Sequence, residues 1–261
     1  MTALAELFPD ADFRFHLTLR RGEPRAFFAA QDASGQRLAE RAKWLTAEPA
    51  RYAALLPEGG PIFGELVEIA ARNWGLAPTT SVGELGAKLE PDFLLLSPDE
   101  TGTFRLRGGA LCFPTGWALE EKLGHTLDFI HGVVPGLNAV LASPIQQFLT
   151  RLKPGIAFLR DNWGIVATDE LNLHPARRLP APSLPVALDR LWLRVEHQAL
   201  VALPRTGGVL FGIRIALHRL DAVACDPAAS AGLRRALTSV PAEVAAYKRL
   251  DAVRETVVGL L

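Results

Sequence analysis

The sequence LWLRVEHQALVALPRTGGVLFGIRIAL, residues 191–217, sets the predicted architecture of this chain. It contains two apolar-rich runs, residues 191–203 and 207–217, of the kind that forms buried or half-buried β-strands. Pro204-Arg205-Thr206-Gly207 lies between them, and a connection this short joins antiparallel neighbours. The stretch therefore predicts a long antiparallel strand pair.

Three other segments have strand-like patterns. Residues 103–113 predict one strand, weakened by two adjacent glycines, and residues 156–167 predict another. In the second, Arg160, Asn162 and Gly164 share one face because side chains alternate along a strand. Residues 13–19 alternate well enough for a further strand, and residues 20–24 read as a turn after it. The rest of the first 60 residues looks irregular.

Helical signals flank these strands. Residues 63–74 carry an amphipathic stripe, and Ser81-Val82-Gly83-Glu84 is a capping box for a short helix to residue 89. Ser143-Pro144-Ile145-Gln146 predicts the start of a helix that runs to about residue 152. Asp226-Pro227 begins a C-terminal helical region, with a second start near Ser239-Val240-Pro241. Helices around an antiparallel sheet define the α+β class.

Composition limits the function classes. The chain has 261 residues, of which 49% are hydrophobic and 21% charged, and 28 basic residues balance 28 acidic ones. A disordered chain would be poorer in apolar residues, and a nucleic-acid-binding protein or an anionic-membrane binder would usually be basic. We expect a single domain over residues 1–261, with an N-terminal extension to about residue 60 and a C-terminal helical region over 226–261. No segment has the length and apolarity of a membrane span, and the N-terminus carries acids rather than the basic start of a signal peptide, so we expect a cytoplasmic protein.

Common catalytic signatures are missing from the sequence. There is no G-x-S-x-G, P-loop or H-E-x-x-H motif, and Gly207-Gly208 does not lie in a dinucleotide fingerprint. The two cysteines, Cys112 and Cys225, are too few for a disulfide framework or an iron–sulfur cluster. Cys112 could offer a thiolate to iron, but a small buried residue is the expected state. None of the six histidines pairs with another at helical spacing, which argues against a local zinc motif.

His131 has unusual surroundings for a histidine. It lies in Asp128-Phe129-Ile130-His131-Gly132-Val133-Val134-Pro135-Gly136, an apolar segment with a glycine directly after the histidine. A neutral imidazole in such a loop can ligate iron while the glycine admits a flat porphyrin. The alternative is a histidine hydrogen-bonded to backbone at a helix end, and the residues alone favour it.

Arg194, Glu196 and Gln198 share one face of the predicted strand 191–203. Three polar side chains in an apolar strand must either face solvent or satisfy one another, as in a pocket lining. We expect Arg160 and Arg214, each on a predicted strand, to be able to join such a cluster, because a guanidinium pairs well with carboxylates.

Several segments together resemble one known family. They are Leu111-Cys112-Phe113-Pro114-Thr115-Gly116-Trp117, Glu121-Lys122-Leu123-Gly124, residues 130–136, Arg160-Asp161-Asn162-Trp163, residues 191–198, and 203–207 with 210–214. Their order and spacing are similar to those of the alpha subunit of haem-dependent oxidative N-demethylases. The resemblance covers about residues 108–220, with a weaker echo at 13–19.

The resemblance implies a PAS-like fold with haem b between the antiparallel sheet and its helices. It implies a monooxygenase subunit that removes a methyl group from a small amine with O₂, using electrons from a separate flavin and iron–sulfur reductase. His131 would be the iron ligand, and Glu196, Arg194 and Gln198 would be the catalytic side chains. The further implied cofactor contacts are Arg160, Arg214 and Trp163. The chain could also assemble with copies of itself.

Two departures from the family pattern keep other functions open. His197 stands where the family has arginine, and Gly212 stands where it has threonine. The histidine could be silent or could remove a propionate or partner contact, and the glycine would leave a void or admit a ligand. The alternatives are a haem-based sensor without turnover and a scaffold subunit without cofactor.

Overall fold

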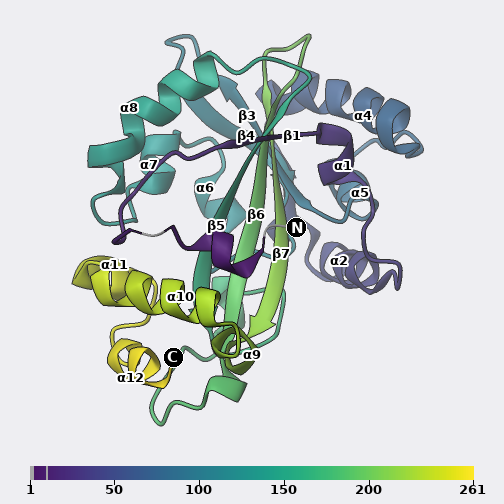
Figure 1. The fold of residues 1–261 in the computed structure, drawn as a ribbon. Helices are drawn as coiled ribbons and strands as arrows, with labels where there is room; N and C mark the ends of the chain where they lie inside the picture. Colours follow the sequence, from purple (N-terminus) through teal and green to yellow (C-terminus); the bar gives the residue numbers. More distant parts are fainter. Residues whose placement is uncertain (1–2, 10) are drawn as a thin grey trace.

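The computed structural model describes residues 3–9 and 11–261 (Figure 1). The strands are β1 Arg20–Gly22, β2 Ala53–Leu55, β3 Asp92–Pro98, β4 Phe104–Ala110, β5 Ala157–Val166, β6 Trp192–Ala202 and β7 Val209–Arg219. The α-helices are α1 Pro24–Phe28, α2 Gln36–Ala47, α3 Pro49–Tyr52, α4 Gly60–Trp74, α5 Val82–Gly86, α6 Leu119–Lys122, α7 Leu127–His131, α8 Leu137–Thr150, α9 Leu220–Ala224, α10 Pro227–Ser239, α11 Ala242–Tyr247 and α12 Arg254–Leu260. Short 3-10 helices are η1 Leu4–Leu7, η2 Pro57–Gly59, η3 Pro175–Arg177 and η4 Leu188–Arg190.

One antiparallel sheet organises the described residues. Its strand order is β1-β5-β6-β7-β3-β4-β2, and every neighbouring pair runs antiparallel. Figure 1 shows α6, α7 and α8 on one side of the sheet and α1, α4 and α5 on the other. The predicted α+β class, an antiparallel sheet flanked by helices, is confirmed.

The predicted antiparallel pair over residues 191–217 is the β6–β7 hairpin. Its register pairs Trp192 with Arg219 at one end and Ala202 with Val209 at the other. Glu65 of α4 holds the turn, because its carboxylate accepts hydrogen bonds from the amides of Arg205 and Thr206. A buried carboxylate satisfied in this way fixes the turn against α4.

The sequence patterns missed β3, which lies between β7 and β4 in the middle of the sheet. Its residues 92–96 are all buried, and Phe93-Leu94-Leu95-Leu96 form a continuous apolar run instead of an alternating one. Phe93 and Leu95 enter the core on one face, whereas Leu94 and Leu96 enter the core on the other. Because apolar and polar residues do not alternate in this run, the alternation pattern cannot identify it as a strand.

The N-terminal predictions are partly wrong. Residues 13–19 are extended but form no strand, and strand pairing begins only at β1, inside the predicted turn. The alternation in 13–19 is real, because Phe13, Phe15, Leu17 and Leu19 are half-buried and the residues between them exposed. It reflects packing against helices. The first 60 residues are also not irregular, since α2 alone spans 12 residues.

Most helix predictions are confirmed, but two boundaries are wrong: α5 ends at Gly86 instead of residue 89, and α8 begins earlier than predicted. α4 covers the predicted amphipathic stripe, Ser81 caps α5 by accepting from the amide of Glu84, and Asp226 caps α10. However, Pro144 lies inside α8 instead of at its start. Gly136, at φ 75°, precedes the first turn of α8, a conformation that suits glycine.

The candidate site residues lie on the two faces of the sheet, which we name by the helices that pack on them. We call the face that carries Arg160, Asn162 and Gly164 of β5 the α7–α8 face, because half-buried residues of those helices pack on its core. We call the other the α4–α10 face, whose core joins residues of these helices to alternate residues of β6.

Candidate functional site

A polar cluster lies on the α7–α8 face of β5 and β6. Arg194, Glu196 and Gln198 of β6 are 1%, 8% and 8% exposed. Their register partners on β5 are Gly164, Asn162 and Arg160, in that order. Paired residues of antiparallel strands project from the same face, so these polar side chains gather in one place. The alternative of a solvent-facing row is therefore wrong.

Glu196 is the acceptor at the centre of this cluster. Its Oε1 accepts a hydrogen bond from the Thr115 hydroxyl at 2.5 Å. Its Oε2 accepts one from Gln198 Nε2 at 2.7 Å and a longer one from Asn162 Nδ2 at 3.4 Å. The carboxylate is thus fixed in direction by three neutral donors, as expected of a group that binds or transfers a proton.

Arg194 holds the loops around Glu196 and has little left for a ligand. Its Nε donates to the Thr115 hydroxyl at 2.9 Å, and Nη2 donates to the carbonyls of Phe113 and Leu171 at 2.8 Å. Burial lowers the pKa of this guanidinium to about 10. We therefore assign Arg194 the positioning of Thr115, and through it of Glu196.

A buried ion pair fixes the segment that precedes Thr115. Arg41 of α2 and Asp92 of β3 pair at 2.5 Å, and both side chains are 0% exposed. Asp92 also accepts from the amides of Cys112 and Phe113 at 2.6 and 2.9 Å. These contacts fix the chain two residues before Thr115.

Arg160 is a cation without a partner at this site. The half-buried side chain makes no hydrogen bond or ion pair with any residue the structure describes. Burial lowers the pKa of Arg160, and the charge of Glu196 partly opposes that shift. A half-buried guanidinium with free donors is suited to binding a carboxylate or another anion.

His131 is the last residue of α7 and is half-buried. Burial lowers its pKa from 6.5, and the nearby charge of Arg160 lowers it further. The imidazole is therefore neutral at pH 7, with a lone pair available, and it has no hydrogen-bond partner among the described residues. His131 and Arg160, far apart in the sequence, are brought into electrostatic contact.

Open space lies beside this cluster, and the helices on its face of the sheet carry exposed apolar side chains. Asn162 is exposed although it lies on an interior strand, and a Cβ added at Gly164 would meet no atom within 4 Å. On α7, α8 and the turn between them, Phe129, Val133 and Val140 are each 52% exposed. Open space, apolar side chains, a neutral imidazole and an unpaired guanidinium fit a flat apolar group that carries acids, as haem does.

Two predicted cofactor contacts do not lie at this site. Arg214 pairs in register with His197, which places it on the α4–α10 face, where it binds Glu90 at 2.7 Å. Trp163 also faces that side and packs edge-on against Phe8 at 5.3 Å. The prediction that Arg214 joins the cluster is wrong because its strand position has the opposite parity.

The two family departures also lie away from the cluster. A Cβ at Gly212 would meet the Phe28 ring at 2.5 Å, so the position is filled and the expected void or ligand space is wrong. His197 points to the α4–α10 face, where its Nδ1 is 2.6 Å from Asp161 Oδ1. Neither residue alters the surroundings of Glu196 directly.

Cys112 is not a thiolate ligand in this structure. The side chain is 0% exposed, and burial raises its pKa to about 12. The predicted buried state is confirmed.

The sequence patterns did not single out Thr115, whose hydroxyl bridges Arg194 and Glu196. They also missed Lys248, whose Nζ donates to the Trp163 carbonyl at 2.6 Å and feels the charge of Glu196. The signal for Thr115 was present, because it lies in one of the quoted family segments. For Lys248, one lysine in a C-terminal helical region gives no comparable signal.

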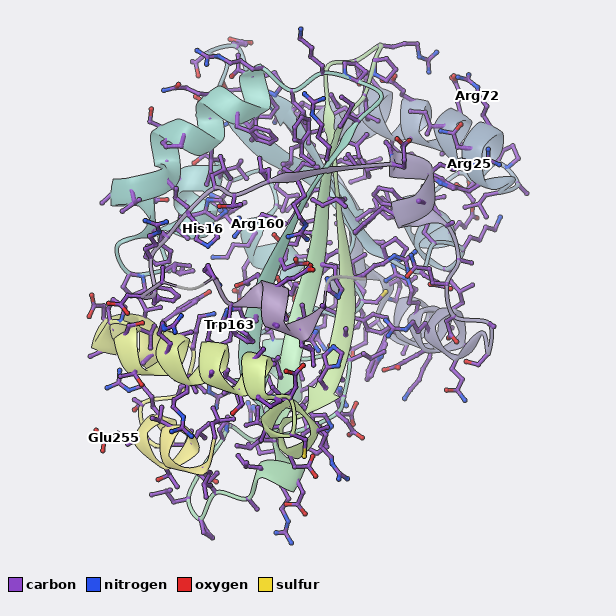
Figure 2. All side chains as sticks on the ribbon, in the orientation of Figure 1. His16, Arg25, Arg72, Arg160, Trp163 and Glu255 are labelled. Atoms are coloured by element: carbon purple, nitrogen blue, oxygen red, sulfur yellow. The ribbon has the colours of Figure 1, made fainter. Side chains whose placement is uncertain are left out.

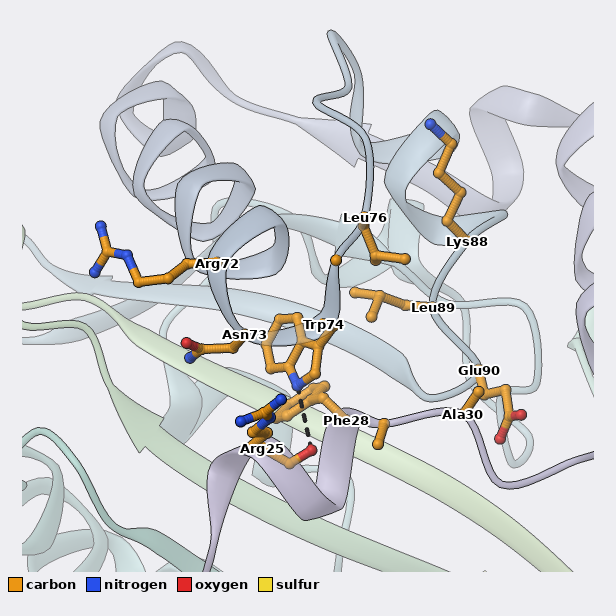
Figure 3. Close-up of a pocket in the computed structure, with 12 residues that line it drawn as sticks. Arg25, Phe28, Ala30, Arg72, Asn73, Trp74, Leu76, Lys88, Leu89 and Glu90 are labelled. Atoms are coloured by element: carbon orange, nitrogen blue, oxygen red, sulfur yellow. Dashed lines mark hydrogen bonds between the residues drawn. The ribbon is translucent and has the colours of Figure 1, made fainter.

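A separate hollow of about 500 Å³ lies between α1, the end of α4 and the segment before β3 (Figure 3). Its floor includes Phe28, Trp74 and Leu89, and the indole of Trp74 donates to the Arg25 carbonyl. None of the predicted site residues lines it, and Figure 3 shows the charged ends of Arg72 and Lys88 pointing away from its centre.

Comparison with protein families agrees with the geometry. Across the described residues, no helix combines the length and apolarity needed to cross a bilayer. A family model described as haem-dependent oxidative N-demethylase, alpha subunit-like, matches residues 62–258. The match covers most of the chain and includes β5, β6, His131 and the Glu196 cluster. The chain therefore belongs to the haem-dependent oxidative N-demethylase alpha subunit-like family.

Proposed function

We propose that this chain binds haem b against the α7–α8 face and removes a methyl group from a small methylated amine. The observation that carries the proposal is that Arg160 and the Glu196 cluster share one sheet face beside open space, with His131 near enough for the charge of Arg160 to lower its pKa. The family membership supports haem and N-demethylation as the chemistry.

In this proposal, His131 provides the nitrogen ligand to iron, because its imidazole is neutral and unpartnered. Arg160 would pair with a haem propionate, an anion that its unpaired N–H donors can bind. Val133 and Val140, the exposed apolar residues after α7 and in α8, would cover the ring. Haem, when bound, supplies the activation of O₂.

The overall reaction balances with two electrons from outside the chain. A methylated amine R₂N–CH₃, O₂, two electrons and two protons give R₂N–H, formaldehyde and water. The methyl carbon is oxidised and its C–N bond breaks, while O₂ is reduced. No flavin or iron–sulfur motif is present in the sequence, so a separate reductase supplies the electrons.

Glu196 binds the amine and handles its proton. Its carboxylate can accept an N–H from an amine or ammonium, and its own donors Thr115 and Gln198 keep it oriented. Asn162, exposed beside it, is placed to hydrogen-bond the same substrate. Arg194 does not touch the substrate and instead keeps Thr115 in place.

The test is an absorption spectrum followed by a turnover assay. The full chain, purified from haem-replete cells, should show a Soret band, and it should release formaldehyde from dimethylamine with O₂ and a reductase. A chain without a Soret band contradicts haem binding and leaves the scaffold alternative. A haem-loaded chain that releases no formaldehyde from any small methylated amine favours the sensor alternative.

His131→Ala tests the ligand. We expect this variant to lose haem or to change its spectrum sharply, while His125→Ala, at an exposed histidine near the same helix, retains the wild-type spectrum. Full haem content with an unaltered spectrum in His131→Ala would remove His131 as the ligand.

A further inference from the structure

Residues 11–19, which we call the strap, cross from α11 to the turn between α7 and α8 (Figure 1). The Phe13 amide donates to the Ser239 hydroxyl at 2.8 Å, and the Phe13 and Phe15 rings meet edge-on at 5.5 Å. Both rings pack on a small core of Val240, Val244 and Ala245. The Phe15 ring also lies 3.8 Å from the Cβ position of Gly136. The strap is thus anchored on both sides of the proposed haem site.

His16 lies between the anchoring residues Phe15 and Leu17 and on the other side of the extended chain. Its ring is accessible and has no hydrogen-bond partner among the described residues. Partial burial, Arg160 and Arg14 all lower its pKa, so the ring is neutral at pH 7. Figure 2 shows His16 and Arg160 beside each other.

One guanidinium therefore has two histidine neighbours. The charge of Arg160 lowers the pKa of His131 from α7 and of His16 from the strap. Both imidazoles thus lie within reach of the Arg160 charge, although 115 positions separate them (131 minus 16). No cluster of three or more His, Cys, Asp or Glu side chains in the described ranges could hold a bare metal ion. Two separate imidazoles beside an open, apolar site instead suit a ring that fills most of the metal's coordination positions itself.

We propose that His16 is a second nitrogen donor to the bound haem, in addition to His131. The inference rests on the proposed function. His16 lies outside the family match of residues 62–258. The packing of Phe13 and Phe15 fixes the backbone of the strap at His16 and leaves the imidazole ring free to reach the haem iron.

Ligation by two imidazoles gives ferric haem a low-spin character. When one imidazole is lost or is replaced by water, the ferric haem becomes high spin. The two spin states differ in their absorption and electron paramagnetic resonance spectra. A displaceable His16 would hold the resting site closed to water until a smaller ligand replaces the imidazole.

The experiment records both spectra of the ferric full-length chain at pH 7, for wild type, His16→Ala and the matched control His218→Ala, at a half-buried histidine of β7. We expect a low-spin wild type and control. We expect His16→Ala to keep its haem stoichiometry through His131, to lose most of the low-spin signal, and to regain it with added imidazole. Because His16 is exposed, its replacement should not impair folding, which circular dichroism verifies.

The outcomes separate the two proposals. A haem-loaded wild type that is high spin, or a His16→Ala variant with the wild-type spectrum, overturns the inference about His16 alone. A wild-type chain that takes up no haem overturns it together with the proposed function.

Discussion

At the scale of single residues, the carboxylate of Glu196 is distinguished by its donors. Thr115, Gln198 and Asn162 are all uncharged, and no residue that the structure describes forms a salt bridge with Glu196. A carboxylate held by neutral donors can accept a further hydrogen bond from a cationic or N–H ligand. Arg194, two residues away on the same face, instead donates hydrogen bonds to the backbone carbonyls of Phe113 and Leu171.

Glu196→Gln should therefore retain fold and haem but lose turnover. The amide can replace some hydrogen bonds but cannot carry the charge or accept a proton, so we expect a fall in kcat of about 100-fold or more. Formaldehyde release and the Soret band measure the two properties. Glu243→Gln, at an exposed glutamate of α11, is the matched control and should leave both unchanged. Wild-type turnover in Glu196→Gln would remove Glu196 from the mechanism.

Lys248 makes stability depend on pH. Burial lowers its pKa from 10.5 to about 8, although Glu196 partly opposes the shift. Between pH 8 and 10.5 the unfolded chain binds more protons at this residue than the folded chain, so its contribution to stability rises with pH. Below pH 8 the contribution is constant, because both states are protonated.

We expect the free energy of unfolding of wild type, relative to Lys248→Met, to rise by up to about 3 kcal/mol from pH 8 to 10.5. Urea unfolding at several pH values measures the difference. Lys88→Met, at an exposed lysine, serves as the control and should give a difference that does not change over this range. A flat difference for Lys248→Met would mean that its pKa is not lowered.

At the scale of elements, β5 combines structural and open positions. The backbone of β5 on the side away from β6 has hydrogen-bond partners. β1 pairs with residues 157–159, and Lys248 donates a hydrogen bond to the Trp163 carbonyl farther along the strand. On its α7–α8 face, however, Asn162 and Gly164 are uncovered. A strand with both neighbours satisfied and one face open is a rigid platform for a ligand.

Gly164→Val and Gly212→Val should have opposite effects on the free energy of unfolding. At Gly164 a side chain meets nothing within 4 Å, so valine should preserve or raise stability by up to about 1 kcal/mol and weaken haem binding by occupying the open space. At Gly212 valine would strike the Phe28 ring, so we expect a loss of about 1–3 kcal/mol. Urea unfolding and haem titration measure both effects. Unchanged haem affinity in Gly164→Val would place the haem elsewhere.

At the scale of the whole molecule, the Arg41–Asp92 pair connects α2, the central strand β3 and the loop before Thr115. Arg41 also donates to the Gly86 carbonyl at 2.7 Å, which ties the end of α5 to the same point. Removing one partner leaves a buried charge that is only partly satisfied.

Arg41→Met should therefore lower the free energy of unfolding by about 3–5 kcal/mol. Denaturant unfolding gives the value, and Arg72→Met, at an exposed arginine of α4, should cost little. Asp92→Asn combined with Arg41→Met should recover part of the loss, because the uncompensated charge is gone. A loss below about 1 kcal/mol in Arg41→Met would contradict a structural role for the pair.

Local patterns were sufficient for the elements with a clear period or cap. The hairpin of β6 and β7, β5 with its two faces, α4, and the caps at Ser81 and Asp226 follow from alternation, amphipathic spacing and turn chemistry. The row of Arg194, Glu196 and Gln198 follows from the same alternation. β3 could not be found this way, since burial on both faces removes its period.

The candidate site was only half visible from such patterns. Parity along each strand fixes which side chains share a face of that strand, but not which residues of two different strands come together. Register alone separates Arg160, opposite Gln198, from Arg214, opposite His197. The contacts of Glu196 with Thr115, and of the strap with Ser239 of α10, join residues 81 and more positions apart.

The order of residues thus specified the antiparallel α+β core, the polar row in β6 and the family, because these depend on short-range periodicity and local motifs. Folding in three dimensions selected the members of the site: it joined His131 and His16 to Arg160, gave Arg194 a positioning role, and removed Arg214 and Trp163 to the other face. Such choices depend on strand register and on long-range packing, whose free energy comes from contacts between segments far apart along the chain.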